Sequence, residues 1–185
     1  MFPLLRFVSD GQEHRVNRAA EGEIVRVRQM RSGEGELCEA ILRSLPDWFG
    51  LEDSIVRYRR DLEEMETYVA EFDGTAVGFF TLAQHNQYTA EIRVMAVRRQ
   101  YHRQGVGRAL LVHAEHLLAQ RDTAYLEVKT LGTSRPDEYY RRTQAFYLAI
   151  GFRPVQEINL WGTENPCLIM IKHLECRHVV AGGEP

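Results

Sequence analysis

The sequence predicts an α/β (α+β) domain built on a mixed, mostly antiparallel sheet, and three observations lead to this prediction. Segment 23–30 alternates apolar and polar residues, which is typical of a half-buried strand. Two further apolar segments flank Asp73 and Gly74, a pair that favours a β-hairpin. Segment 88–97 is predicted to be a further strand, and a glycine-containing turn and an amphipathic helix follow it. Hairpins together with a strand–turn–helix unit indicate a mixed sheet.

Length and composition restrict the class of protein. The chain has 185 residues, of which 44% are hydrophobic and 26% charged, so one core suffices and neither a disordered chain nor a fibrous repeat is expected. The net charge of −3 argues against a surface built to bind nucleic acid. No apolar segment reaches the length of a membrane span, and the three cysteines are few and widely spaced. We therefore expect a cytoplasmic protein with neither nucleic-acid nor membrane partners.

Two helices are predicted between the first strand and the hairpin. Apolar residues recur at helical spacing from Leu37 to Leu45, and Pro46 ends this helix. A second helix carries Ile55, Tyr58, Leu62 and Met65 on one face.

The second half of the chain continues the alternation of strands and helices. Segment 124–130 reads as a strand, and Asp137 can cap a helix that stops at Gly151. Two last strands are expected within 152–161 and 167–174. The predicted organisation is a flexible N-terminal arm outside the fold (1–22), one domain (23–174) and a C-terminal tail (175–185).

Gly105 and Gly107 lie where a strand has ended and a helix begins. Without side chains at these positions the backbone can approach a ligand closely, and the free amides of the helix start face any bound anion. A pyrophosphate is the ligand that this arrangement favours. Positive charge for a cofactor with several phosphates surrounds the turn, from Arg98, Arg99, His102, Arg103 and Arg108.

Other interpretations of the turn are a tight turn with a solvated basic face, or another phosphate motif. A Walker loop requires GxxxxGK followed by Ser or Thr, which is absent. A Rossmann fingerprint requires a glycine or alanine where Leu110 stands, although Glu127 lies at a suitable distance for the ribose. The dinucleotide-binding interpretation is weakened and stays open.

The string around the turn resembles the acyl-CoA motif of the GNAT superfamily of N-acetyltransferases: Arg or Gln, two residues, Gly, one residue, then Gly or Ala. His102, Gly105 and Gly107 take those places, and His102 departs from the pattern. The order of elements over 23–174 also resembles the family. The resemblance implies the GNAT acyl-CoA N-acyltransferase fold, with helices on both faces of the sheet, and acetyl-CoA as co-substrate.

The resemblance also implies a set of cofactor contacts. The backbone of Met95, Ala96 and Val97 would pair with the pantetheine arm like an added strand, which requires an open strand edge beside the motif. The pyrophosphate would lie against His102, Arg103, Gln104, Gly105, Val106, Gly107 and Arg108.

Glu91 is the candidate general base, because the strand AEIRVMAV resembles the strand that carries the base in the histone acetyltransferase branch. Attack on a thioester requires a neutral amine, so the site must remove a proton. The alternative is a strand-edge carboxylate that faces water or pairs with Arg93.

Tyr147 is the candidate general acid, because AFYLAIGF resembles the family's second motif, whose tyrosine lies near the coenzyme A sulfur. The alternative is core packing beside Phe146 and Ile150. The family often has an asparagine where this chain has Tyr140, which leaves that cofactor contact in doubt.

The amine acceptor stays open between small molecules and protein amines. Trp48, Phe49, Tyr139 and Trp161 are candidates to line its side of the site. No metal is expected, and His113 with His116 is interpreted as a surface pair. The predicted function is transfer of an acetyl group to a primary amine. The oligomeric state stays open, with a homodimer as one option because dimers are common in the family. A non-catalytic acyl-CoA sensor and a dinucleotide-binding protein are the alternatives.

Overall fold

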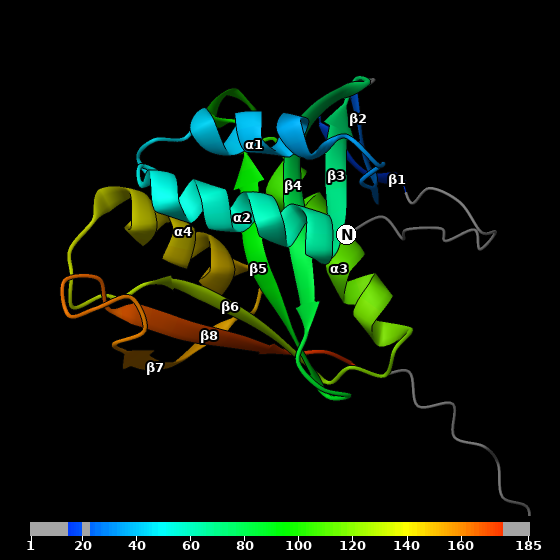
Figure 1. The fold of residues 1–185 in the computed structure, drawn as a ribbon. Helices are drawn as coiled ribbons and strands as arrows, with labels where there is room; N and C mark the ends of the chain where they lie inside the picture. Colours follow the sequence, from blue (N-terminus) through cyan, green and yellow to red (C-terminus); the bar gives the residue numbers. More distant parts are fainter. Residues whose placement is uncertain (1–14, 20–22, 176–185) are drawn as a thin grey trace, which may run out of the picture.

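The computed structural model describes residues 15–19 and 23–175, which form one eight-stranded sheet with helices on both faces (Figure 1). Within these residues no helix is long and apolar enough to cross a bilayer. The elements, in chain order, are β1 (Arg15–Ala19), β2 (Glu23–Gln29), α1 (Gly35–Arg43), α2 (Glu52–Glu64), β3 (Glu66–Phe72), β4 (Thr75–Gln84), β5 (Thr89–Val97), the 3-10 turn η1 (Arg99–Tyr101), α3 (Val106–Ala119), β6 (Tyr125–Leu131), α4 (Glu138–Ala149), β7 (Arg153–Ile158) and β8 (Cys167–His173).

The sheet is mixed and mostly antiparallel, as predicted. Its strand order is β1-β2-β3-β4-β5-β6-β8-β7, and β5 with β6 is the parallel pair among the described strands. The hairpin between β3 and β4 turns at Asp73 and Gly74, whose φ angles of 48° and 75° are those of a two-residue hairpin turn. This antiparallel topology contradicts the doubly wound parallel sheet that a dinucleotide-binding protein of the Rossmann kind requires.

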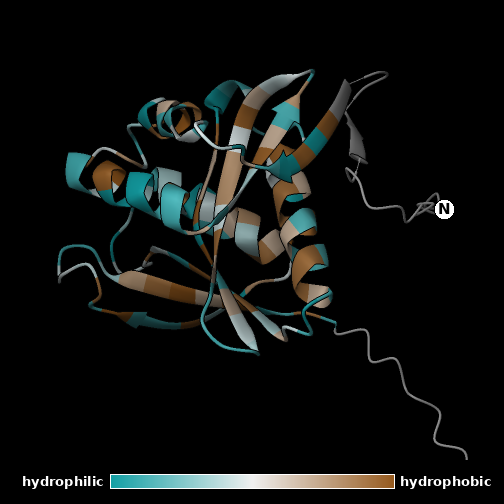
Figure 2. Cartoon of the chain, turned by 45° about the vertical axis from the view of Figure 1, so that its right-hand side comes forward, coloured by the Kyte–Doolittle hydropathy of each residue, from teal (hydrophilic) through white to brown (hydrophobic). Residues whose placement is uncertain are grey.

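Helices cover both faces of the sheet because neighbouring residues of a strand point to opposite sides. Phe79 packs in a core with α1 and α2, whereas Phe80 packs in a second core with α3. Tyr147 brings α4 to the second core. Figure 2 shows the same division in hydropathy: β8, inside the sheet, is mainly brown, whereas β7 at the edge is mainly teal.

β5 contains an irregularity that reorients its side chains. Val94 pairs with Thr81, but Leu82 pairs with Ile92, so Arg93 is an extra residue opposite β4. Before this bulge Ile92 faces the core with α3, and directly after it Val94 faces the core with α1 and α2. Glu91 lies on the opposite face from Ile92 by simple alternation, and the bulge brings Val94 to the same α1–α2 face, where Arg93 pairs with Asp61 of α2.

β5 and β6 diverge after a short paired stretch. Their parallel pairing extends from Thr89 to Ile92 on β5, with Val128 as the last partner on β6. Beyond this point β5 continues to Val97 and β6 to Leu131 without pairing to each other. The open strand edge that the sequence analysis requires is thus present, on the side of β5 that faces β6 (Figure 1).

Several sequence expectations need correction or stay untested. His113 is buried against the ring of Tyr68, so its assignment to the surface is wrong, whereas the neighbouring His116 is half-buried. The strand expected within 152–161 is shorter, since β7 ends at Ile158. Of the predicted arm 1–22, the structure describes Arg15–Ala19, which pairs with β2 as β1. The other arm residues and Cys176 to Pro185 lie outside the described residues, and the domain bounds stay predictions.

Candidate active site

The glycine-containing turn has the backbone geometry of an anion site. Gly105, at the N-cap of α3, has a φ of +85°, and Arg103 also lies in the left-handed region with a φ of +65°. Gly105 cannot be replaced without strain. At Gly107 an added Cβ would lie 3.2 Å from the ring of Phe146, so a side chain here would have to displace this ring. The first amides of α3 have no partner within the helix and carry the positive end of its dipole.

The arginines around the turn differ in whether they already form an ion pair. Arg99 pairs with Asp47 and lies over the ring of Trp48, so it belongs to the local structure. Among the described residues, no acidic side chain pairs with the other three arginines beside the turn, Arg98, Arg103 and Arg108. These arginines are available to a ligand with several phosphates.

His102, at the first position of the predicted motif, contacts the backbone of β5 and the ring of Trp48. Its Nε2 atom lies 2.7 Å from the carbonyl oxygen of Val97, and its ring meets that of Trp48 edge-on. The imidazole thereby connects the end of β5 to the turn. Histidine at this position, in place of Arg or Gln, thus takes part in holding the turn on the strand.

A cavity of about 1050 Å³ extends from this turn along the diverged part of β5. Its walls come from β5, the turn, β6 and α4, and Trp48, Phe49 and Trp161 close its other side. Of the predicted cofactor residues, the cavity is lined by Met95, Ala96, Val97, His102, Arg103 and Gly107. The rest lie beside it: Gln104, Gly105 and Arg108 are exposed at the turn, and Val106 is buried in the core below.

Tyr147 packs in the core, as one interpretation predicts, and it also lies in the cavity wall; its role as an acid stays a prediction. Its ring packs against Phe146 and Phe152, and it is 7% exposed, yet it lines the cavity. Burial raises the pKa of Tyr147 above the usual phenol range, so the phenol stays protonated at neutral pH. The arrangement suits a proton donor.

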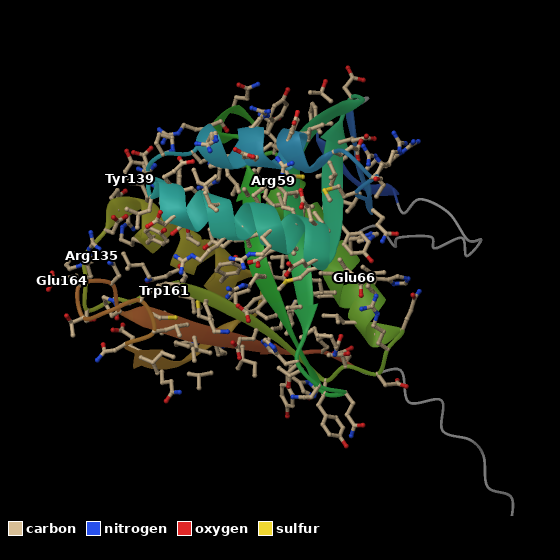
Figure 3. The ribbon with its side chains drawn as sticks, in the orientation of Figure 1. Arg59, Glu66, Arg135, Tyr139, Trp161 and Glu164 are labelled. Atoms are coloured by element: carbon tan, nitrogen blue, oxygen red, sulfur yellow. The ribbon has the colours of Figure 1, made fainter. Side chains whose placement is uncertain are left out.

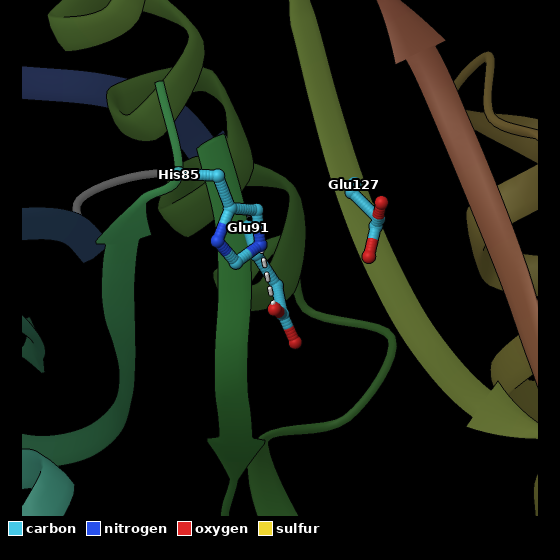
Figure 4. A group of neighbouring side chains, drawn as sticks. All are labelled: His85, Glu91 and Glu127. Atoms are coloured by element: carbon cyan, nitrogen blue, oxygen red, sulfur yellow. Dashed lines mark hydrogen bonds and ion pairs between the residues drawn. The ribbon is translucent and has the colours of Figure 1, made fainter. Parts of the chain in front are cut away.

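Glu91 lies below the divergence of β5 and β6 and is 3% exposed, which contradicts the alternative of a carboxylate facing water. Its Oε2 atom lies 2.9 Å from His85 Nε2 and 2.8 Å from Lys129 Nζ (Figure 4 draws the His85 contact). Arg93 is more distant, at 3.8 Å from Oε1. Glu91 also borders a small recess of about 50 Å³, so it is buried but reachable.

Comparison with known proteins agrees with this geometry. A family model described as an acetyltransferase (GNAT) domain matches residues 63–154, which include β5, the glycine turn and α4. The chain belongs to the GNAT acetyltransferase superfamily. Comparison with curated protein sequences finds no match.

Solved structures show the same GNAT fold. A GNAT-family protein from Desulfovibrio desulfuricans superposes with a TM-score of 0.72 at 17% identity, over 82% of this chain and 99% of that one. The ribosomal-protein-S18-alanine N-acetyltransferase of Escherichia coli gives a TM-score of 0.65 at 19% identity, over 86% and 97%. A GNAT acetyltransferase from Elizabethkingia anophelis with acetyl-CoA bound gives 0.63 at 18%, over 81% and 98%.

Lys129 and His85 were missed by the sequence analysis of this GNAT domain. Lys129 lies between two carboxylates, Glu91 on β5 and Glu127 two residues away on β6. A signal existed, because Glu127 and Lys129 alternate with the buried Leu126 and so share the opposite face of the strand. No pattern in the sequence predicts the contact between His85 and Glu91.

A metal ion is not required at this cluster. Ligand atoms of His85, Glu91 and Glu127 lie within 4.8 Å of one another, a spacing that a metal ion could bridge. The ammonium of Lys129 contacts both carboxylates and supplies the positive charge that a metal would bring. A metal-free GNAT site stays our prediction.

Trp48, one of the aromatic residues predicted for the acceptor side of the GNAT domain, is held by hydrogen bonds with α4. Trp48 Nε1 donates to Thr143 Oγ1, and Tyr140 donates its hydroxyl hydrogen to the carbonyl of Trp48. Tyr140, at the position of the family's asparagine, thus fixes the loop after α1. Tyr139 packs against Trp48 outside the cavity wall, whereas Trp161 comes from the loop after β7 (Figure 3).

Proposed function

We propose that this GNAT protein is an enzyme that transfers the acetyl group of acetyl-CoA directly to a primary amine. The observation that carries the proposal is the continuity of the site. One cavity runs from the glycine turn, along the unpaired edge of β5, to the wall that holds Tyr147 and Lys129. A long cofactor with a charged end and a reactive end fits such a path.

The turn and the strand edge would bind the cofactor through backbone groups. The amides at the start of α3, with Arg103 and Arg108, suit a pyrophosphate. The unpaired edge of Met95–Val97 offers donors and acceptors to the amides of the pantetheine arm, as a neighbouring strand would.

The chemistry removes two protons from the acceptor ammonium, returns one to the leaving thiolate and needs no covalent enzyme intermediate. Glu91 accepts the first proton from the ammonium, and the neutral amine then forms the C–N bond while the C–S bond breaks. Tyr147 gives its phenolic proton to the departing thiolate, and the second proton, which the nitrogen loses as the amide forms, restores the phenol. Because Glu91 is buried and contacts Lys129, we favour proton transfer through a water in the recess beside it, which has room for one.

A second candidate function is acyl-CoA binding without catalysis. One observation favours it: Lys129 contacts Glu91 at 2.8 Å, which is also the arrangement of a purely structural ion pair. A turnover assay with amine acceptors distinguishes the two candidates. The acceptor itself is not set by the fold; the Escherichia coli neighbour is named for an alanine of ribosomal protein S18.

The experiment is a calorimetric titration with acetyl-CoA beside coenzyme A, NAD and ATP. We expect micromolar binding of acetyl-CoA, on the order of −8 kcal/mol. Gly105→Ala and Gly107→Val should weaken it at least about tenfold, because they strain or fill the turn. Gly33→Ala is the matched control, since Gly33 has the same φ of +85° but lies before α1. Binding of NAD or ATP alone would overturn the proposal.

A further inference from the structure

The recess beside Glu91 is lined by three cations from three different elements. Arg57 comes from α2, Arg93 from β5 and Lys129 from β6. Tyr58 and Trp161 complete the wall and supply apolar surface. The recess shares Tyr58, Arg93, Lys129 and Trp161 with the wall of the large cavity, and Glu91 lines the recess, so an acceptor in the cavity can approach Glu91 from this side.

Two of these cations are already paired. Lys129 contacts Glu91 and Glu127, and Arg93 Nε lies 3.1 Å from Asp61 Oδ2. Arg57 differs, because its one hydrogen bond among the described residues goes to the neutral hydroxyl of Ser54, at 3.1 Å. Its guanidinium is exposed at the rim of the recess and retains unused donors.

The charges of the recess and its partners balance without a substrate. The three cations of the recess are balanced by three carboxylates, those of Asp61, Glu91 and Glu127. No surplus of negative charge therefore attracts a polycationic amine. An anionic group on the acceptor would instead gain a charge-assisted and potentially bidentate contact with a guanidinium. The amine end of the same molecule would lie toward Glu91.

We propose that the acceptor is a small primary amine that carries a carboxylate on the same molecule, with the carboxylate bound by Arg57 beside Trp161. This inference rests on the proposed acetyltransferase function and names its substrate class. Arg57 is then a specificity-determining residue of the acceptor site. The charge balance makes amines with several positive charges poor acceptors.

The test compares acceptors of equal length that differ in the carboxylate alone. Acetylation by the full chain is measured through released coenzyme A for β-alanine against propylamine, 4-aminobutyrate against butylamine, and 6-aminohexanoate against hexylamine. Phosphoethanolamine against ethanolamine asks whether a phosphate replaces the carboxylate, and spermidine is the polycation. We expect kcat/KM about 10- to 100-fold higher for the carboxylated member of at least one pair, the value of a hydrogen-bonded charge.

Arg57→Met tests the residue. We expect the ratio within the preferred pair to fall toward one, through a higher KM with kcat kept, and Arg57→Lys to keep part of the preference. Arg60→Met is the matched control, because Arg60 is an exposed arginine of the same helix outside the recess. Saturation-transfer NMR of the carboxylated amine, with coenzyme A present, should show binding to the parent chain and its loss in Arg57→Met.

Failure of the inference differs from failure of the proposed function. Absence of acetyl-CoA binding in the calorimetric titration would reject the function. With cofactor binding established, three results would overturn the inference alone: no acetylation of any carboxylated amine, equal use of both members of every pair, or preference for spermidine or phosphoethanolamine. An unchanged ratio in Arg57→Met would reject the role of this residue.

Discussion

Lys129 Nζ lies 2.8 Å from Glu91 Oε2 and also contacts Glu127, so one ammonium joins the carboxylates of two parallel strands below the point where they diverge. Burial acts to lower the pKa of Lys129, but the hydrogen bonds that Lys129 donates to these carboxylates, together with Coulomb attraction, outweigh it and raise the pKa. The lysine therefore stays charged and stabilises the closed end of the GNAT site.

Lys129→Met should destabilise the fold by about 2 to 4 kcal/mol, because it leaves a buried carboxylate without its cation. Urea denaturation at pH 7 measures the loss. Lys172→Met is the control, since Lys172 pairs with the single, more exposed Glu115. Equal losses in both variants would contradict a special role for Lys129.

Glu91→Gln should lower turnover about 100-fold or more while acetyl-CoA affinity stays near that of the parent, because the amide cannot accept the proton. Glu127→Gln is a matched control that also removes a negative charge beside Lys129. Its turnover should fall less than about tenfold. Steady-state kinetics and calorimetry on both variants check this, and a fully active Glu91→Gln would remove Glu91 from the mechanism.

Tyr147→Phe should keep the fold and acetyl-CoA binding but slow turnover about tenfold or more, because the thiolate loses its proton donor. Burial raises the pKa of Tyr147, so the parent enzyme should lose no rate through its ionisation below about pH 10. Tyr68→Phe is the control, since Tyr68 is equally buried at 7% exposure but donates to Glu66 away from the cavity. Equal turnover in the two variants would refute an acid role.

Thr130→Val should stabilise the protein by about 1 kcal/mol, because the buried hydroxyl of Thr130 has no hydrogen-bond partner among the described residues. Valine keeps the shape of the side chain. Thr81→Val should have the opposite sign, since the hydroxyls of Thr81 and Thr67 are buried 3.1 Å apart and one would lose its partner. Thermal unfolding of both variants reports the signs, and destabilisation by Thr130→Val would contradict the reasoning.

Acid should weaken the contact between β2 and the start of α1. A hydrogen bond from Arg28 lowers the pKa of Glu34 from 4.5 to about 2, against the effect of burial. A depressed pKa adds stability above pH 4.5 that is lost as the pH falls toward 2. Glu34→Gln and Arg28→Met should both reduce the slope with which the free energy of unfolding changes with pH between about pH 4.5 and 2. An unchanged slope in both would show that the pair adds nothing.

Local sequence determined the elements whose signals need no distant partner. Alternation set the strands, Asp73 and Gly74 set the hairpin, and Asp137 caps α4 by accepting from the amides of Tyr139 and Tyr140. Gly105 set the turn at the start of α3. These features depend on backbone conformations and on contacts within a few residues, which is why they could be predicted.

The tertiary structure decided what depends on residues far apart in the chain. The register shift that makes Arg93 an extra residue and the divergence of β5 from β6 arise from the pairing of whole strands. Lys129 reaches Glu91 across 38 positions because two parallel strands are adjacent. Burial of His113 follows likewise from the packing of α3 on the sheet. Periodicity gives the face on which a side chain lies, but only the assembled sheet determines which charge it meets.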